Sequence, residues 1–418
     1  MIKILEGNCI DKLQEINDES VDCVVTSPPY WGLRDYGTAT WEGGKEDCPH
    51  FRTSHQSEHT ITGQKKSVLY GGIGDSIYKS VCKLCGAKRI DKQLGLEDTP
   101  EEYVQSMVKI FREVKRVLKD HGTVWLNLGD SYSSGGRKTN INQTVRGDTD
   151  YGVTRPPVYK GIKPKDLVGI PWRAAFALQE DGWYLRQDII WNKPNPMPES
   201  VQDRCTKSHE YIFLLSKKDK YYYDNEAIKE KSIYAGDDRG SRHDSRRCTD
   251  MNSVSGVTSG MKNKRSVWTV ATKPYKEAHF ATYPPDLIEP CILAGCPEKV
   301  CVECGNPQVK EFYRKEKYNV GYGNQHTPKG THKKIGGVYQ KWLEENPPKI
   351  TIKPSCGCNK SFKSGTVLDP FGGAGTTGLV ADRLGRNTTL IELNKSYADI
   401  MEKRLRNDNS LFLDLETT

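Results

Sequence analysis

The sequence has no long hydrophobic run. No stretch of its 418 residues approaches the roughly 18 consecutive apolar residues that span a membrane, and the amino-terminal MIKILEGNCIDKL lacks the apolar core and cleavage site of a secretory signal. Internal repeats are also absent. These absences predict a cytoplasmic protein with no membrane partner. The 35% of hydrophobic residues suffice for the core of one large α/β domain with insertions, or of two or three domains.

The chain also lacks a strong charge of one sign: 62 basic and 54 acidic residues give a net charge of +8. The excess of basic residues is concentrated in three segments. Residues 131–173 carry 8 basic and 3 acidic side chains, residues 225–278 carry 11 and 7, and residues 301–364 carry 12 and 5, which leaves the remainder net acidic. This distribution predicts that the basic insertions meet a polyanion, although each could also be a solvated loop.

Cysteine is abundant, with 13 residues, and in a reducing compartment it indicates metal ligands or buried thiols rather than disulfides. Residues 82–86 and 301–305 both read C-x-x-C-G, a turn that presents two thiolates to one tetrahedral ion. The alternatives are inert buried thiols and, in the first set, His55 or His59 as the fourth ligand. The predicted ligands of two structural zinc sites are Cys48, His50, Cys82 and Cys85, and Cys301, Cys304, Cys356 and Cys358.

Strands and helices are predicted in alternation, which favours a mostly parallel sheet. Thr99 is a good helix cap, with Pro at the first helical position and Glu three residues after the cap, and the predicted helix ends at Gly122. Residues 210–217 and 221–224 are predicted to pair as strands about a turn. Residues 225–275 are polar without periodicity, as in a loop or a small recognition module.

Two prolines end the second predicted strand. The β-branched run in residues 21–26 is followed by Ser27-Pro28-Pro29-Tyr30. Proline fixes φ and donates no backbone hydrogen bond, so the strand must end here with its last carbonyls unpaired by a continuing ladder. These carbonyls are therefore predicted to accept hydrogen bonds from another partner.

A glycine-rich turn near the carboxyl end has the context of a nucleotide-binding loop. Residues 371–378, FGGAGTTG, follow a strand that ends at Asp369 and open a helix; Glu392 ends the next strand, where it can accept hydrogen bonds from both hydroxyls of a ribose. Only 26 residues follow Glu392, so the remaining strands must come from the amino-terminal part of the chain. This predicts a nucleoside-cofactor site in a permuted α/β domain.

Five collinear motifs resemble those of the S-adenosylmethionine-dependent DNA amino-methyltransferases of the permuted β class. They are ILEGN…SVDCVVTSPPYWG, GTVWLNLGDSY, IIWNKPNPMP…SHEYIFLLSK…YYYD, HFATYPPDLIEPCILAG, and DPFGGAGTTG with LIELN. The resemblance implies a Rossmann-like methyltransferase fold with a mixed, mostly parallel sheet and circularly permuted motif order, interrupted here by zinc-knuckle and recognition insertions. The predicted parts are a catalytic half (1–40), a first knuckle insertion (41–95), the continued core (96–224) with a basic loop (131–165), a target-recognition region (225–275), a core helix (276–296), a second knuckle insertion (297–362) and a cofactor-binding half (363–418).

In that family, a base swung out of the duplex enters the loop that reads Ser-Pro-Pro-Tyr here. By resemblance, the Ser27 hydroxyl and the Pro28 carbonyl accept the amino hydrogens, Pro29 completes the loop, and Tyr30 stacks on the base. Transfer is then direct and in line. The resemblance also implies contacts to S-adenosylmethionine from Asn8, His279, Phe280, Ala281, Tyr283, Pro284, Asp369, Phe371, Gly373, Gly375, Thr376, Thr377 and Glu392.

Two residues bear on how the cofactor is bound and on which base is methylated. Asn8 stands where the family usually has Asp, although Asn can still bond to an adenine edge. Ser27 is the version usual in N4-cytosine enzymes, whereas Asp or Asn is usual in N6-adenine enzymes. The resemblance therefore favours N4 of cytosine in double-stranded DNA, with N6 of adenine as the alternative.

Sequence readout is expected in the variable basic region 225–275, where this class carries its target-recognition residues. A cognate restriction endonuclease would be a further partner. Each basic side chain there could instead contact phosphate or solvent. The candidate DNA contacts are Arg239, Arg242, Arg246, Arg247, Lys262, Lys264 and Arg265.

Three other functions compete with this one. Pro290-Cys291 resembles the nucleophile of cytosine-C5 methyltransferases, but it lies in a predicted helix rather than on a loop after a strand. A methyltransferase for protein amides would carry Asn in place of Ser27. A DNA-binding protein with an inactive methyltransferase fold would not be expected to keep Ser27, Tyr30 and the glycine loop intact.

Overall fold

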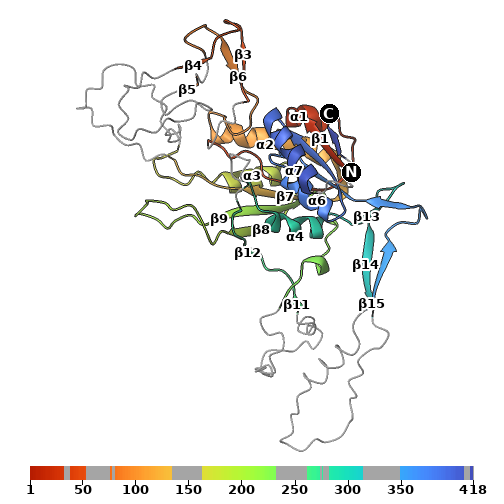
Figure 1. Cartoon of the computed structure of the whole chain (residues 1–418). Coiled ribbons are helices and arrows are strands. Elements are labelled where there is room, and N and C mark those ends of the chain that lie inside the picture. Colours follow the sequence, from red (N-terminus) through yellow and green to blue (C-terminus); the bar gives the residue numbers. More distant parts are fainter. Residues whose placement is uncertain are drawn as a thin grey trace, which may run out of the picture.

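The computed structural model describes residues 1–32, 38–52, 76–77, 81–133, 162–231, 261–273, 275, 282–313, 349–408 and 415–417. A nine-stranded sheet forms its centre (Figure 1). In spatial order the strands are β12 (Val267–Thr269), β8 (Tyr184–Asn192), β9 (His209–Ser216), β7 (Leu118–Leu128), β2 (Val21–Thr26), β17 (Thr366–Asp369), β18 (Asn387–Glu392), β1 (Ile2–Glu6) and β19 (Leu415–Thr417).

The sheet is mixed and mostly parallel, as predicted. Within it, β9 runs antiparallel to its neighbours β7 and β8, and the other neighbouring strands are parallel. Strands β17 and β18, from the carboxyl-terminal part of the chain, lie between β2 and β1 from the amino-terminal part. The two ends of the chain therefore build one sheet, which confirms the permuted α/β fold.

Helices cover both faces of the sheet and make a three-layer structure (Figure 1). Alternate residues of β7 show the division, since Val124 and Leu126 are buried on one face and Trp125 on the other. No helix in the described part of the chain is long and apolar enough to cross a bilayer. On the first face lie α1 (Cys9–Gln14), α2 (Pro100–Val117) and α3 (Ile170–Glu180); on the second lie α4 (Pro285–Gly295), α6 (Thr376–Arg383) and α7 (Lys395–Asp408).

Short two-stranded sheets project from this core, and most of them flank segments that lie outside the described residues (Figure 1). A 3-10 turn, Glu226–Ile228, lies between β9 and β10. The pairs are β3 (Thr40–Glu42) with β6 (Lys88–Ile90), β4 (Phe51–Arg52) with β5 (Ser76–Ile77), β10 (Glu230–Lys231) with β11 (Met261–Lys262), β13 (Lys299–Cys301) with β16 (Phe362–Ser364), and β14 (Gln308–Tyr313) with β15 (Lys349–Pro354).

Helix α2 begins as predicted and ends earlier than predicted. The Thr99 hydroxyl and the Glu102 side chain form a reciprocal capping box. The helix stops at Val117, and β7 begins at Leu118, which pairs with Val21 of β2. Gly122, expected to close the helix, lies within β7, where a Cβ atom would sit 2.5 Å from the Leu118 side chain. Pairing with β2 therefore outweighs the helical pattern.

The prediction of a strand at residues 221–224 is wrong. Both edges of β9 are already occupied, by β7 and β8, so no ladder position remains for a following hairpin strand. The segment instead bonds elsewhere: the Tyr222 amide donates to the His121 carbonyl at 2.8 Å, and the Asp224 amide donates to the Ala294 carbonyl at 2.9 Å.

Candidate active site and metal centres

The predicted active-site motifs meet at one edge of the sheet. Parallel strands end at the same edge, so β1, β2, β7, β17 and β18 deliver their following residues to one place. These residues are 7–8, 27–30, 129–130, 370–375 and 392–394. The topology thus brings together the Ser-Pro-Pro-Tyr loop and the glycine loop, which lie more than 300 residues apart in the chain.

The Ser-Pro-Pro-Tyr loop is held by hydrogen bonds at Pro29 and at the following Trp31, but not at the Pro28 carbonyl. The Tyr103 hydroxyl donates to the Pro29 carbonyl at 3.0 Å, and the Trp31 indole donates to the Glu97 carbonyl at 2.9 Å. In the part of the chain that the structure describes, the Pro28 carbonyl accepts no hydrogen bond. The Pro28 carbonyl is thus free of a continuing ladder, as expected after the two prolines, and its binding partner stays a prediction.

The Tyr30 side chain is held at its hydroxyl. That oxygen lies 2.8 Å from Glu210 Oε2, 3.0 Å from Asn127 Oδ1 and 3.3 Å from Ser27 Oγ. Burial, followed by the charge of Glu210, raises the pKa of Tyr30 well above its usual value, so the hydroxyl stays protonated. At residue 129 glycine is needed, because a Cβ atom there would lie 2.5 Å from Cε2 of the Tyr30 ring.

Sequence reasoning missed four residues of this site: Asn127, Gly129, Lys193 and Glu210. Lys193 pairs with Glu210 Oε1 and lies 4.2 Å from the Trp191 ring centroid. A signal was available, because all four lie in the quoted motifs GTVWLNLGDSY, IIWNKPNPMP and SHEYIFLLSK. What the motifs do not contain is the strand order that turns these positions toward Tyr30.

Asp369 joins three of the motifs. Its carboxylate is fully buried and accepts hydrogen bonds from the hydroxyls of Thr26 and Thr377 at 2.6 Å each, of Tyr283 at 2.8 Å, and from the Phe371 amide at 3.1 Å. Burial raises the pKa of Asp369 above its usual value. Strand β2, the glycine loop and the segment before α4 are therefore tied to one side chain.

The glycine loop wraps over the end of β18. Gly373 has φ of +52°, and a Cβ atom there would meet nothing closer than 3.9 Å, so open space lies above it. Its amide donates to Glu392 Oε2 at 2.8 Å, and the Asn394 amide donates to Glu392 Oε1 at 2.9 Å. Burial raises the pKa of Glu392. Gly375 has φ of +75° and packs against Met401, with 2.5 Å between its Cβ position and the Met401 side chain.

The other predicted cofactor residues are only partly placed. Asn8 caps α1, since its side chain accepts from the Ile10 amide at 3.0 Å. Pro284 is the residue that precedes α4. The Thr376 hydroxyl accepts from Arg404 at 2.9 Å. The predictions for His279, Phe280 and Ala281 lie outside the described residues.

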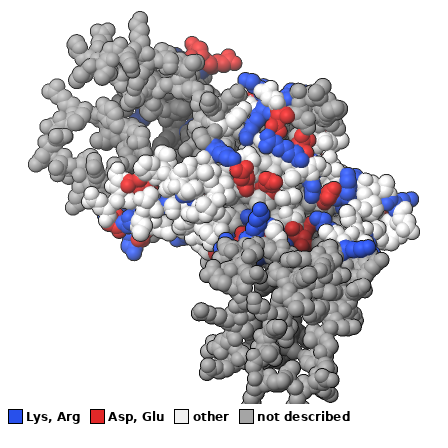
Figure 2. Space-filling view, turned by 60° about the horizontal axis from the view of Figure 1, so that its bottom comes forward, with Lys and Arg blue, Asp and Glu red and all other residues white. Residues whose placement is uncertain are grey.

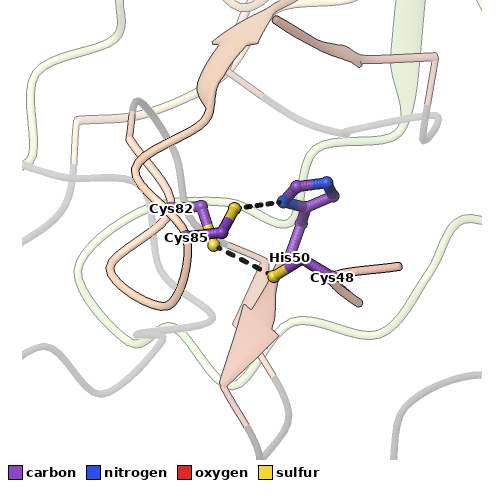
Figure 3. Close-up of side chains that lie close together, drawn as sticks. All are labelled: Cys48, His50, Cys82 and Cys85. Atoms are coloured by element: carbon purple, nitrogen blue, oxygen red, sulfur yellow. Dashed lines mark hydrogen bonds between the residues drawn. The ribbon is translucent and has the colours of Figure 1, made fainter. Parts of the chain in front are cut away.

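The first set of predicted metal ligands converges as Figure 3 shows. Cys48 Sγ lies 3.7 Å from Cys82 Sγ, and Cys85 Sγ lies 3.5 Å from His50 Nδ1. A tetrahedral zinc ion would place two sulfur ligands about 3.8 Å apart, and sulfur and nitrogen ligands about 3.6 Å apart. A backbone hydrogen bond at Lys45 lowers the pKa of Cys85 to about 6, which favours the thiolate. His55 and His59, the alternative ligands, are not described.

The second set converges in the same way. The ligand atoms of Cys301, Cys304, Cys356 and Cys358 all lie within 4.8 Å of one another. Both C-x-x-C-G turns close with the same two bonds: the glycine amide donates to the first cysteine's carbonyl, and the first cysteine's amide donates to the carbonyl five residues on. A backbone hydrogen bond at Asn306 lowers the pKa of Cys304 to about 7. Each donor set suits a closed, four-coordinate structural zinc site.

Most candidate DNA contacts are not described, namely Arg239, Arg242, Arg246 and Arg247. The others have partners within the protein. Lys262 and Arg265 both pair with Glu230, at 3.3 and 2.6 Å, and Lys264 lies 4.9 Å from the Trp268 ring centroid. On the face in Figure 2, basic and acidic side chains are interspersed over the described surface.

Cys291, the rival nucleophile, is placed as predicted in helix α4. It is fully buried, and burial raises the pKa of its thiol well above the usual value. A nucleophilic cysteine needs an accessible thiolate, so this thiol is part of the core.

Comparison with known proteins gives one family. The model of the N6/N4 methyltransferases, described as DNA methylase, matches residues 21–302 and 356–403. The chain is 37% identical to the Type II methyltransferase M.SmaI of Serratia marcescens over 406 residues, which cover 96% of this chain and 90% of that protein. It is 36% identical to M.Cfr9I of Citrobacter freundii over 407 residues, with 97% and 88% covered.

Among solved structures, the chain is similar to the PvuII DNA methyltransferase (cytosine-N4-specific). The match covers 99% of this chain and 93% of that chain, with 15% identity and a TM-score of 0.46.

Proposed function

The chain belongs to the N6/N4 DNA methylases, which transfer a methyl group from S-adenosylmethionine to an exocyclic amine of a DNA base, and we propose that its target is N4 of cytosine. The observation that carries the proposal is the Ser27-Pro28 pair that follows β2, where a hydroxyl lies beside a carbonyl that accepts no hydrogen bond from the described residues. Serine at this position is typical of N4-cytosine enzymes. N6 of adenine is the second candidate, because the family methylates both amines.

The loop is suited to an amine that must become nucleophilic. A base can reach it only after leaving the stack. The Pro28 carbonyl and the Ser27 hydroxyl would each accept one amino hydrogen, which turns the nitrogen lone pair out of conjugation and toward the methyl donor. Tyr30 would hold the ring by stacking. The amine nitrogen would bond to the methyl carbon as the carbon–sulfur bond breaks, and the methylated amine would then lose a proton to solvent. Alignment and preorganised acceptors supply the acceleration, without a covalent intermediate.

The cofactor would lie over the glycine loop. S-adenosylmethionine supplies an electrophilic methyl group on a positively charged sulfur. The open space above Gly373 suits a bound nucleoside, and the second lone pairs of the Glu392 carboxylate suit ribose hydroxyls. Because the side chains of Asp369 and Thr377 are engaged with each other, we assign them to shaping the loop, with Phe371, Gly373 and Glu392 next to the cofactor.

Zinc and DNA recognition are further parts of the proposal. The two cysteine-containing clusters would each hold one zinc ion, with four protein ligands and no catalytic water. Residues 225–275 would read the DNA sequence. Since the similar proteins are Type II methyltransferases, a restriction endonuclease that cuts the same site would accompany the enzyme.

The test is expression of the chain in a methylation-deficient bacterial host, followed by single-molecule sequencing of genomic DNA and mass spectrometry of its nucleosides. N4-methylcytosine in one fixed motif is the expected result. N6-methyladenine would keep the mechanism and overturn the assignment from Ser27.

A matched variant tests the loop itself. Ser27→Ala is expected to lower methylation at least about a hundredfold, because it removes a preorganised acceptor, while S-adenosylmethionine affinity stays within about twofold. Loss of cofactor binding instead would show that the base site and the cofactor site have been placed wrongly.

A further inference from the structure

A chain of hydrogen bonds leads from the Ser27 hydroxyl into the protein. Ser27 Oγ donates to the Tyr30 hydroxyl at 3.3 Å, and Tyr30 donates to Glu210 Oε2 at 2.8 Å. The other oxygen of the carboxylate pairs with Lys193. Glu210 and Lys193 have side chains that are only 15% and 19% exposed, so this ion pair lies largely out of water.

The hydrogen count gives the chain a direction. A tyrosine hydroxyl has one hydrogen to donate, and its pKa is raised, so the hydrogen is present. Two acceptors face it, Glu210 Oε2 at 2.8 Å and Asn127 Oδ1 at 3.0 Å. The carboxylate is both closer and charged, so it takes the hydrogen. The Tyr30 oxygen is left with lone pairs, one of which accepts from Ser27.

Counting donors and acceptors also fixes the orientation of the Asn127 side-chain amide. Its Nδ2 donates to the Tyr211 carbonyl at 3.0 Å and approaches Glu210 Oε2 at 3.4 Å, so its oxygen must face Tyr30. In the described part of the chain, the Ser27 hydroxyl forms a hydrogen bond with Tyr30 and none with Asn127 or Glu210. The Ser27 hydrogen is therefore directed to Tyr30.

A serine hydroxyl is an ambiguous partner for an amino group, because it can donate to the nitrogen lone pair as well as accept from N–H. Donation would block the lone pair that has to attack. An aspartate at this position can only accept, and it carries a charge. An enzyme with serine at this position therefore needs another group that makes the hydroxyl oxygen accept a hydrogen bond from the amino group.

We propose that Glu210 is the positioning residue that supplies this group: through the Tyr30 hydroxyl it commits the Ser27 hydrogen inward and leaves the Ser27 Oγ lone pairs to the amino group of the base. No proton moves along the chain. The anion polarises both hydroxyls, which makes Ser27 Oγ a stronger acceptor. Lys193 keeps the carboxylate oriented by holding its second oxygen. The inference rests on the proposed role of Ser27 in base binding.

The experiment uses the full-length enzyme and a duplex oligonucleotide that carries its mapped site. Single-turnover methylation is measured with enzyme and S-adenosylmethionine in excess, for Glu210→Gln, Tyr30→Phe and the double variant. Tyr30→Phe keeps the ring for stacking and removes the relay. Glu113→Gln is the matched control, a glutamate paired with Arg116 on α2 and away from the site.

Each single variant is expected to lose about tenfold in single-turnover rate, and the double variant is expected to be no slower than Tyr30→Phe, because both changes break the same chain. Affinities for DNA and cofactor stay within about threefold, and Glu113→Gln behaves as the unaltered enzyme. A normal rate for Glu210→Gln, losses that multiply in the double variant, or a loss of DNA affinity equal to the loss of rate would each overturn the relay.

Ser27→Ala, measured alongside, separates the two proposals. If it is inactive while Glu210→Gln is fully active, Ser27 keeps its proposed role and the relay is wrong. If Ser27→Ala is itself fully active, the proposed role of Ser27 fails, and the relay fails with it.

Discussion

The two cysteine-containing clusters share a turn and differ in what they touch. In both, a C-x-x-C-G segment closes with the same pair of backbone hydrogen bonds, and its glycine has nearly the same φ, +76° at Gly86 and +71° at Gly305. Yet the segment after the first cluster contacts the edge of the sheet that carries the Ser-Pro-Pro-Tyr loop, whereas the second cluster contacts the opposite edge at Lys119. Figure 1 draws β3 and β6 far from β13.

The segment that follows the first cluster packs against the Ser-Pro-Pro-Tyr loop. After β6, which pairs with β3, the chain reaches Gly95 and Glu97, and their carbonyls accept hydrogen bonds from the Gly32 amide and the Trp31 indole. A Cβ atom on Gly95 would lie 3.0 Å from the Tyr30 carbonyl, so the two segments are in close contact. A change in the conformation of this insertion is therefore expected to alter the Ser-Pro-Pro-Tyr loop.

The second cluster is attached where the parallel strands begin. The Gly305 carbonyl lies 3.5 Å from Lys119 Nζ, and Lys119 pairs at 2.7 Å with the fully buried Asp22. Asp22 also accepts from the Thr366 amide at 2.8 Å and contacts His121 at 3.0 Å. This carboxylate joins the starts of β2, β7 and β17. We therefore expect the first C-x-x-C-G turn to affect turnover and the second to affect stability, because they are attached to different edges of the sheet.

The largest expected effect is on stability at the second edge. Asp22→Asn should lower the free energy of unfolding by about 3 kcal/mol, because it leaves Lys119 in a largely buried site without its anion. Urea unfolding with zinc present measures the change, and the methylation rate per folded molecule should stay constant. Asp18→Asn, in an exposed pair with Arg116, is the control and should cost less than about 1 kcal/mol. Equal losses for the two variants would remove Asp22 from its assigned role.

Replacing one cysteine in each cluster tests whether the two clusters have different roles. Cys82→Ser and Cys304→Ser should each leave about one zinc ion per chain, because serine is a poor zinc ligand. The first should lower single-turnover methylation about tenfold at unchanged cofactor affinity, since the catalytic loop loses its support. The second should lower only the unfolding temperature. Zinc content by mass spectrometry, rates and thermal unfolding test this, and equal effects on rate would contradict the assignment of the two edges.

The smallest expected effect concerns the two glycines. Alanine at either position must adopt a left-handed conformation, which costs about 1 kcal/mol. A Cβ atom on Gly86 meets nothing within 4 Å, whereas one on Gly305 lies 3.2 Å from the Lys119 side chain, so Gly305→Ala should cost more. Competition with a zinc chelator measures the loss. Asparagine, which tolerates this conformation, should restore most of it at both positions, and a failure to do so at Gly86 would show that φ is not the cause.

Features that depend on neighbouring residues were predictable. The capping box at Thr99, the turns that carry the cysteines and the end of β2 before Pro28 all follow from a few adjacent side chains. The wrong predictions concern segments whose structure depends on pairing with strands that are distant in the sequence. Gly122 lies in a strand because β7 pairs with β2, and residues 221–224 form no strand because β9 is already paired on both edges.

The candidate site divides in the same way. The Ser-Pro-Pro-Tyr loop, the glycine loop and the eight cluster ligands could be named from the sequence, since each motif carries its own chemistry. Asn127 and Glu210 could not be assigned to Tyr30, because they lie 97 and 180 residues away from it in the chain. Only the strand order, which sets β7 between β2 and β9, brings the three together.

The local features of this protein follow from the sequence alone: two turns that each bring a pair of cysteines together, a strand stopped by prolines and a loop of glycines, all specified by φ preferences and donor chemistry within a few residues. Only the tertiary structure decided what each feature serves. Parallel pairing placed the two loops at one edge, set the segment that follows the first cluster against the Ser-Pro-Pro-Tyr loop and the second cluster against Lys119, and buried Asp369 among donors from three motifs. Such contacts depend on strand order, which no single segment encodes.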